Sequence, residues 1–248
     1  MKNGILLLTV LLAMQSLPTE SFAMSKALNF FSALSSNITG LFGRAIGSSS
    51  PCTDCAAQYR GPKPPAGSGL PVWSEHPDGE KWTQYTVEAI EKEGLANLNP
   101  KDAPYYCPNW NNLTLAQRKN FWLNMVSKMA ELESVLNPSM VHHDKGNAAG
   151  LESNGLLAMS TTQCSYLKTR ADTLNPKKNL HCGVHTIKYW LVKTNAIGGH
   201  DGLTGIGNNW QIFVPNPIHD KEWTRASQNA VMKHMRALPY CKITGVIE

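Results

Sequence analysis

The amino-acid sequence predicts one mainly α-helical domain with a small β or loop region, preceded by two segments of different character. Apolar residues recur at helical spacing in several stretches between residues 81 and 237, whereas strand-like alternation is scarce. Residues 24–72 carry little periodic apolar pattern. With 42% hydrophobic and 17% charged residues among 248, the chain can bury a core and differs from intrinsically disordered sequences.

Residues 1–23 are expected to be a signal peptide. Lys2 supplies a positive charge, and residues 4–14 form an apolar run that is too short to span a bilayer. Small residues follow at Ser21 and Ala23, so we expect cleavage after Ala23 and export to the periplasm or the medium. An uncleaved membrane anchor is the alternative. No later stretch is apolar enough to predict stable membrane insertion.

Residues 24–72 are rich in Ser, Gly and Pro, above all at 47–51 and 61–69, and are expected to form a flexible or loosely packed arm. The folded domain is expected over residues 73–248. Its predicted helices cover residues 81–93, 114–136, 161–171, 179–194 and 223–237. Thr114 is the expected N-cap of the longest helix, which Asn137 and Pro138 should end. The modest strand candidate is 210–214.

The cysteine content predicts disulfides. An even number of cysteines in an exported chain favours oxidised pairs, although six cysteines allow 15 pairings. A local bond is expected between Cys52 and Cys55, with a redox or metal role as the alternative. Cys164 and Cys182 flank one loop between predicted helices, so we expect them to pair. Cys107 and Cys241 are the two cysteines that remain, so we expect a bond between them.

The helix predicted over 114–136 carries an acidic residue on its apolar side. Trp122, Val126, Met129 and Glu133 recur at steps of four, three and four, so they share one stripe. Partial burial and the negative end of the helix dipole both favour a protonated carboxyl at this position. A protonated carboxyl near neutral pH is what a general acid needs. The alternative is a glutamate that bends into solvent.

Three short blocks resemble a known family. They read Glu133-Ser134-Val135-Leu136-Asn137-Pro138, then Gly155-Leu156-Leu157-Ala158, then a segment from Asp172 to Gly183 that contains Asn179. In order and spacing these resemble the soluble lytic transglycosylase and goose-type lysozyme family, glycoside hydrolase family 23. The resemblance covers residues 114–195 well and the rest poorly.

The resemblance implies a lysozyme-like fold of the transglycosylase type and cleavage of the β-1,4 bond between N-acetylmuramic acid and N-acetylglucosamine in peptidoglycan. Glu133 falls on the family's essential acid, and Ser134 on a residue that helps to orient it. Gly155 and Leu156 fall on the block that passes beside the cleaved sugar. Asn179 falls on a residue that fixes the loop supporting the catalytic helix. No metal or cofactor is implied, and the protein is expected to be a monomer.

The sequence also departs from the family pattern. Ala158 stands where the family has a sugar-contacting Gln, and Ser160 where the goose-type branch has an Asp. The late Tyr-Asn-Ala-Gly motif is not visible. Tyr166, Tyr189 and Tyr240 are substitutes for its tyrosine between which the residues do not decide, and Tyr166 is retained as a candidate sugar contact.

Whether the reaction is hydrolysis or transglycosylation is open from the sequence. Inverting hydrolysis needs a second carboxylate about 6.5–9.5 Å from the acid. Asp144 and Glu152 are the nearest candidates, and Glu152 is retained as a candidate substrate-binding residue. A carboxylate that reaches the sugar would suit an ammonium group. The sequence could thus be close to a predatory-bacterium lysozyme that acts on N-deacetylated peptidoglycan.

Other functional classes compete with this interpretation. Metal binding by 142–144 or by His181 and His185 is disfavoured because the spacing defines no ligand set. A Cys/His hydrolase would use Cys164 or Cys182 with His185 or His200. A non-catalytic wall-binding module on a lysozyme-like fold is the remaining alternative. The net charge of +5 suits an anionic polymer and is too small to indicate nucleic acid. The glycine-rich stretch 198–207 is expected to be a surface loop.

Overall fold

The computed structural model describes residues 61–143, 152–214 and 222–243. The expected signal peptide, most of the arm, the pair Cys52 and Cys55, and Asp144 lie outside the described residues. The described part is mainly helical with a small two-stranded sheet, which confirms the predicted fold class. None of its helices is long and apolar enough to cross a membrane.

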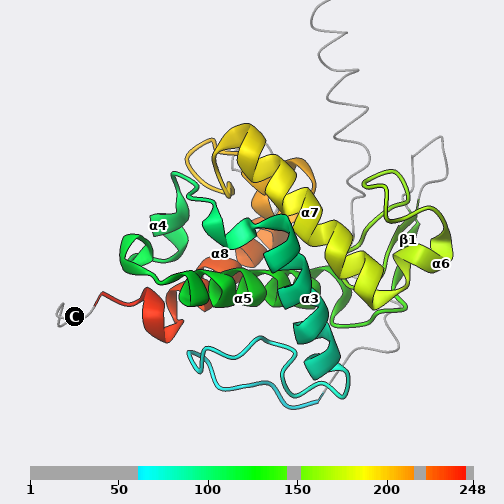
Figure 1. Ribbon diagram of the computed structural model, residues 1–248, viewed down its shortest axis with the longest axis horizontal. Coiled ribbons are helices and arrows are strands. Elements are labelled where there is room, and N and C mark those ends of the chain that lie inside the picture. Colours follow the sequence, from blue (N-terminus) through cyan, green and yellow to red (C-terminus); the bar gives the residue numbers. More distant parts are fainter. Residues whose placement is uncertain (1–60, 144–151, 215–221, 244–248) are drawn as a thin grey trace, which may run out of the picture. The chain divides into compact units, whose positions relative to one another are not determined.

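The described chain is built from helices, short 3-10 turns and one two-stranded hairpin. In order these are α3 (Gly79–Glu93), η1 (Leu95–Asn97), α4 (Ala103–Tyr106), η2 (Trp110–Asn112), α5 (Leu115–Ser134), β1 (Val141–His143), β2 (Glu152–Asn154), α6 (Arg170–Thr173), α7 (Pro176–Thr194), η3 (Gly205–Asn208), η4 (Gln211–Phe213), α8 (Glu222–Arg236) and η5 (Pro239–Cys241). Figure 1 shows α5 running through the middle, with α3 lying across it and the hairpin and α6 at one end, and α7 packs against α3.

Helix α5 is the centre of the core. Phe121, Trp122, Met125, Val126 and Met129 are fully buried on it, and α3 and α8 both pack against it. Burial of five large side chains on one helix is a major favourable contribution to folding, about 1.5–3 kcal/mol for each side chain.

The two ends of α5 are set by different devices. Thr114 is the N-cap as predicted, and its side chain and that of Gln117 form a reciprocal capping box. The helix ends at Ser134, two residues before the expected end, because Val135 and Leu136 both adopt left-handed backbone angles, with φ of 53° and 60°. The helix is therefore ended by a reversal of the backbone, before the chain reaches Pro138.

The helix predicted over 161–171 is wrong. Short polar side chains hold this segment as a loop, because Ser160 N donates to the side chain of Gln163 and the Ser160 and Thr162 hydroxyls are 2.9 Å apart. Helix α6 begins only at Arg170, where Thr169 and Asp172 form a capping box.

The strand predicted over 210–214 is also wrong. Phe213 N donates to Trp210 O at 2.9 Å, which closes the 3-10 turn η4. Its apolar side chains are buried in the core without a partner strand. The strands that the structure does form, β1 and β2, pair antiparallel with Val141 opposite Asn154 and His143 opposite Glu152.

Both predicted long-range disulfides are confirmed. Cys107 and Cys241 join the end of α4 to η5 across a sequence separation of 134 residues. Cys164 and Cys182 join the loop before α6 to α7. Cys182 lies inside α7, which has Asn175 as its N-cap and starts three residues earlier than predicted.

The last residues of the predicted arm contact α5. Val72 N donates to the Ser127 hydroxyl at 3.1 Å, and the Asn124 side chain donates to Gly69 O at 3.1 Å. The Lys63 ammonium forms an ion pair with Glu131. The described end of the arm thus lies along the central helix, while the boundary at residue 73 stays a prediction.

Candidate active site

Glu133 occupies the last turn of α5, at the end of the predicted apolar stripe. The other three members of that stripe are fully buried, as expected from the spacing. Glu133 itself is partly buried. Loss of hydration raises the pKa of its carboxyl from the ordinary value to about 7. The group is therefore about half protonated at neutral pH.

The neighbouring carboxylate, Glu131, has the opposite character. Burial alone would raise its pKa, but hydrogen bonds from Lys128 and Lys63 outweigh the burial and lower it. Two carboxylates two residues apart on one helix are thus held in different protonation states. At neutral pH Glu133 is therefore the member of the pair that can donate a proton.

Ser134 does not reach the Glu133 carboxylate through its hydroxyl. The side chain is fully buried, and its hydroxyl donates to Ala130 O at 2.9 Å. Any orienting effect on Glu133 must pass through the helix backbone. That Ser134 helps to orient Glu133 stays a prediction, and such an effect would be indirect.

The loop 154–159 continues from β2 of the hairpin, and its conformation depends on a glycine. Gly155 has φ of +73°, and its N–H donates to Met140 O at 2.8 Å. A Cβ at this position would lie 2.4 Å from Thr173 O and 2.6 Å from the Asn179 side-chain nitrogen. Only glycine fits between these groups.

The side chain of Asn179 bonds to this loop and to the end of α6. Its side-chain nitrogen donates to Asn154 O at 2.9 Å and to Thr173 O at 2.8 Å. Its side-chain oxygen accepts from Leu157 N at 3.0 Å. The fully buried amide therefore joins α7, the end of α6 and the loop through three hydrogen bonds.

Two other residues of the loop have different surroundings. Leu156 is fully buried, so its side chain belongs to the core. Ala158 is half-buried with φ of +49°. It presents a methyl group where the family has an amide.

The structure does not place Glu152 on the Glu133 side of the hairpin. Glu152 is paired with Arg170 at 2.8 Å and with His143, its cross-strand partner, at 3.3 Å. His142 lies on the other face of the hairpin, because side chains alternate along a strand, and its Nε2 is 3.2 Å from Glu133 O. Glu152 thus faces α6. The sequence suggests His142 only as a metal ligand and gives no signal for its contact with the catalytic turn.

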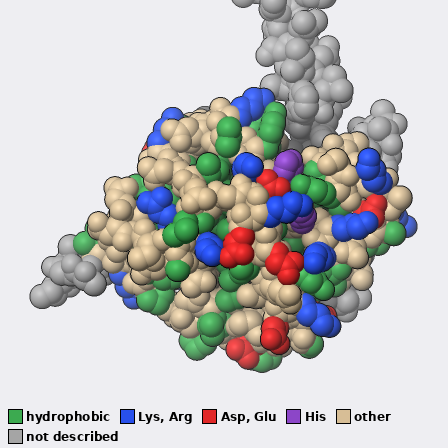
Figure 2. Space-filling view, viewed as in Figure 1, with side chains coloured by type: hydrophobic (Ala, Val, Ile, Leu, Met, Phe, Trp, Pro, Cys, Tyr) green, Lys and Arg blue, Asp and Glu red, His purple; other side chains and the backbone are tan. Residues whose placement is uncertain are grey.

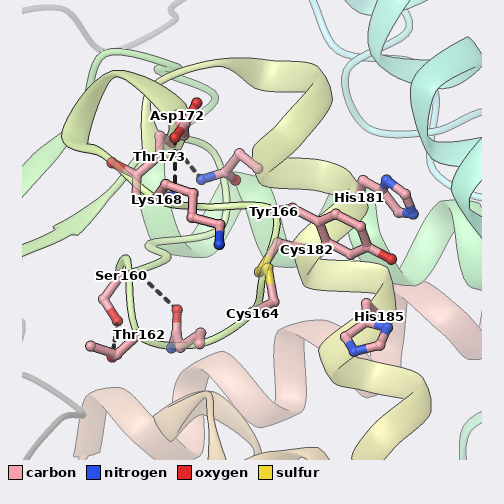
Figure 3. The surroundings of a disulfide bond; sticks show 12 residues. Ser160, Thr162, Cys164, Tyr166, Lys168, Asp172, Thr173, His181, Cys182 and His185 are labelled. Carbon is pink, nitrogen blue, oxygen red and sulfur yellow. Dashed lines mark hydrogen bonds between the residues drawn. A yellow bond between two sulfur atoms is a disulfide. The ribbon is translucent and has the colours of Figure 1, made fainter.

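Tyr166 lies beside α7 and away from the loop that Asn179 holds. Its ring stacks on His181 with centroids 4.2 Å apart, and its hydroxyl donates to Glu93 at 3.4 Å. Figure 3 shows this stack next to the disulfide of Cys164 and Cys182. His181 and Asn179 are two residues apart and so lie about 200° apart around the helix. Tyr166 therefore stays a candidate sugar contact without support from its position.

The alternative of a Cys/His hydrolase is wrong, because Cys164 and Cys182 are bonded to each other and neither provides a thiolate. His200 instead contacts the buried Asp102 at 3.2 Å. Among residues 61–143, 152–214 and 222–243, no group of three or more His, Cys, Asp or Glu side chains is arranged to hold a metal ion.

The mainly helical fold with its small two-stranded sheet is that of a lysozyme-like domain. No protein-family model matches the sequence, and no curated protein matches it either. Among solved structures it is similar to the Bdellovibrio lysozyme-like protein DslA (Bd0314), in its wild-type form 2 and in two mutants that each replace one glutamate by glutamine. The TM-score is 0.61 and the identity 27% to 28%, over 70% of this chain and 98% of each DslA chain.

The Gly155→Ala variant should lower the free energy of unfolding by about 3 kcal/mol, because the methyl group meets Thr173 O and Asn179 at a left-handed position. Gly202→Ala is the matched control, since its φ of +74° is nearly the same but nothing lies within 4 Å of the new methyl group. The control should cost about 1 kcal/mol. Denaturant unfolding measures both, and equal losses would contradict the close packing at Gly155.

Replacing Glu133 by Gln should change stability in a pH-dependent manner. The raised pKa of Glu133 means that the unfolded chain releases its proton first as pH rises, so wild-type stability falls between about pH 4.5 and 7. Glu133→Gln should be more stable than wild type by about 3 kcal/mol at pH 8 and equal to it at about pH 4. Glu131→Gln, measured in the same titration, should instead be less stable than wild type at about pH 8.

Proposed function

We propose that the chain is a peptidoglycan-cleaving muramidase in which Glu133 is the general acid. The observation that carries the proposal is the carboxyl of Glu133, which ends a buried apolar stripe and has a pKa of about 7. The likeness to DslA supports it, since two of the matched forms replace a glutamate by glutamine. The expected bond is the β-1,4 link between N-acetylmuramic acid and N-acetylglucosamine.

In this mechanism the protonated Glu133 donates to the glycosidic oxygen as the C1–O bond breaks, and positive charge develops on the sugar ring. The resulting carboxylate then acts as a base. It accepts a proton from the muramyl C6 hydroxyl in transglycosylation, which closes a 1,6-anhydro ring. In hydrolysis the proton comes from water.

The surroundings of Glu152 favour the reaction that needs one carboxyl. Inverting hydrolysis requires a second, available carboxylate at about 6.5–9.5 Å. Glu152 is engaged by Arg170 and His143 on the far hairpin face. A hydrolytic reaction would then depend on Asp144, which follows β1 and lies outside the described residues.

We also propose a preference for N-deacetylated glycan. Ala158 offers no amide to hydrogen-bond an acetylated sugar at the position where the family has Gln. Export is proposed from residues 1–23, and the two disulfides are of the kind that persists in oxidising compartments.

Glu133→Gln should lower the rate of clearing of purified sacculi by about 100- to 10,000-fold, because the amide has no proton to donate. Circular dichroism should show an unchanged fold. Glu131→Gln, whose carboxylate is ion-paired, is the control and should retain activity. A fully active Glu133→Gln protein would contradict the assignment and favour a different acid, whereas wild-type binding without any cleavage would favour a wall-binding module.

The products of sacculus digestion decide between the two reactions. Mass spectrometry should show anhydro ends, lighter by one water than reducing ends, if the single-carboxyl mechanism holds. The same digestion with and without prior deacetylase treatment tests the substrate preference. Treated sacculi should be cut faster, and equal rates would exclude the preference for deacetylated glycan.

A further inference from the structure

Helix α7 has two sides with different surroundings. Asn179 and Gly183, one turn apart, face the loop 154–159. Asn179 holds this loop by hydrogen bonds, and a Cβ on Gly183 would lie 2.1 Å from the side chain of Leu157. Residues two positions further on point about 200° away, to the outer side of the helix. The outer side is therefore separate from the candidate active site.

Basic and aromatic side chains follow the accessible half of α7 from its first turn to its last, on an arc that turns by about 160° around the helix axis between Lys177 and Lys193. We call them the outer track: Lys177, His181, His185, Lys188, Tyr189 and Lys193. Trp190, at the far end, points in nearly the same direction as Asn179 but lies about 16 Å further along the axis. At 1.5 Å per residue the track is about 24 Å long. Most of its side chains are accessible, with exposed fractions of 60% for Lys177, 42% for His185 and 52% for Tyr189, whereas His181 is 20% exposed beneath the Tyr166 ring.

The surface is hollowed at the start of the track. Two adjoining hollows between α3 and α7, of about 220 and 380 Å³, share Tyr85 and Lys177 in their walls. The Lys177 ammonium lies 5.2 Å above the centre of the Tyr85 ring. An aromatic ring at the wall of a hollow, with a cation above it, is suited to a ring-shaped polar group that carries a nearby anion.

The far end of the track repeats this combination. The rings of Tyr189 and Trp190 are 5.0 Å apart and nearly perpendicular. The Lys193 ammonium lies 5.0 Å from the centre of the Trp190 ring. Val192 is 65% exposed next to them, so the aromatic pair is bordered by accessible apolar surface.

The acidic residues near the track are fewer than the basic residues and are already paired with them. Glu93 is nearly buried and is already surrounded by His185 at 3.1 Å and Lys188 at 3.3 Å, and Glu88 pairs with Lys177. Lys193 forms no ion pair among the described residues, and Lys92 adds a further cation over Tyr166. Figure 2 shows basic, acidic and histidine side chains interspersed on the face where α7 and α3 lie in front.

We propose that the outer track is a second binding site for the wall polymer, separate from the site of cleavage. Lysines would hold carboxylates of the peptide stems, while Tyr85 and the pair Tyr189 and Trp190 would stack against sugar rings. This inference rests on the proposed function, because it names the same polymer. A track about 24 Å long suits an extended strand better than a small molecule. It would keep the enzyme on an insoluble substrate between cleavage events.

Co-sedimentation with purified sacculi tests the track directly. All proteins carry Glu133→Gln, so that no cleavage occurs during the assay. The track variant combines Lys177→Gln, Tyr189→Ser and Lys193→Gln. A matched control combines Lys101→Gln, Leu115→Ser and Lys242→Gln, which removes two charges and one exposed large apolar side chain elsewhere.

The track variant should bind sacculi about tenfold more weakly than the parent, equivalent to about 1.4 kcal/mol, and the difference should shrink at high salt. The matched control should bind as the parent does. Equal binding by both variants, with unchanged circular dichroism, would overturn the proposal. A lysine-only variant with Lys177→Gln and Lys193→Gln replaces the triple variant if that protein unfolds, and should weaken binding about threefold or more.

Two further arms separate this proposal from others. With Glu133 intact, turnover of a short soluble muropeptide should be equal in track and control variants, while turnover of sacculi should fall in the track variant alone. A fall with the soluble substrate would place the track in the cleavage site and contradict the proposal. A DNA duplex serves as an anionic probe, and binding to it tighter than to sacculi would indicate a nucleic-acid surface instead. Failure of cleavage by wild type would overturn the proposed function without affecting the binding result.

Discussion

The side-chain amide of Asn179 is the interaction on which the site most depends. It bonds to the backbone at Asn154, Leu157 and Thr173, which belong to β2, the loop after it and α6. Because the amide is fully buried, water cannot replace any of these partners. The hairpin, the loop below it and the start of α7 are thereby kept at fixed separation, and the missing side chain of Gly155 allows them to approach closely.

A second constraint is electrostatic. A carboxyl without a cation near it is destabilising when it is partly buried, and Glu133 is kept in this condition while Glu131 is relieved by two lysines. The fold tolerates the partly buried carboxyl of Glu133 because α5 buries many large apolar side chains elsewhere along its length. The raised pKa of Glu133 therefore costs stability at neutral pH, and the burial of its neighbours on α5 offsets that cost.

The parts predicted correctly from the sequence are those governed by local rules. The stripe of α5 follows from helical periodicity, and Thr114 caps its helix because its side chain and that of Gln117 meet two free backbone N–H groups. The pairing of Cys164 with Cys182 follows from their position on either side of one loop. Segments 161–171 and 210–214 differ from prediction for different reasons. The first has side chains that bond the backbone in place of a helix, and the second is apolar because it is buried, not because it is a strand.

The surroundings of Glu152 and Tyr166 could not be predicted from the sequence, because each depends on partners far along the chain. Which face of a three-residue strand meets α5 is decided by the hairpin register, and no local pattern specifies it. The stack of Tyr166 on His181 likewise brings together a loop and a helix that a disulfide joins. Position relative to Glu133 is therefore the least predictable property of the site.

The two left-handed residues that end α5 have a consequence for how the acid is presented. Val135 and Leu136 occupy a backbone region that residues with branched side chains avoid, and such conformations persist only where the surroundings impose them. Leu136 is held by burial in the core. The turn that carries Glu133 is therefore a property of the assembled domain and not of its own sequence. An isolated α5 peptide would lack the packing that ends the helix at Ser134, so the direction of the Glu133 side chain depends on tertiary structure.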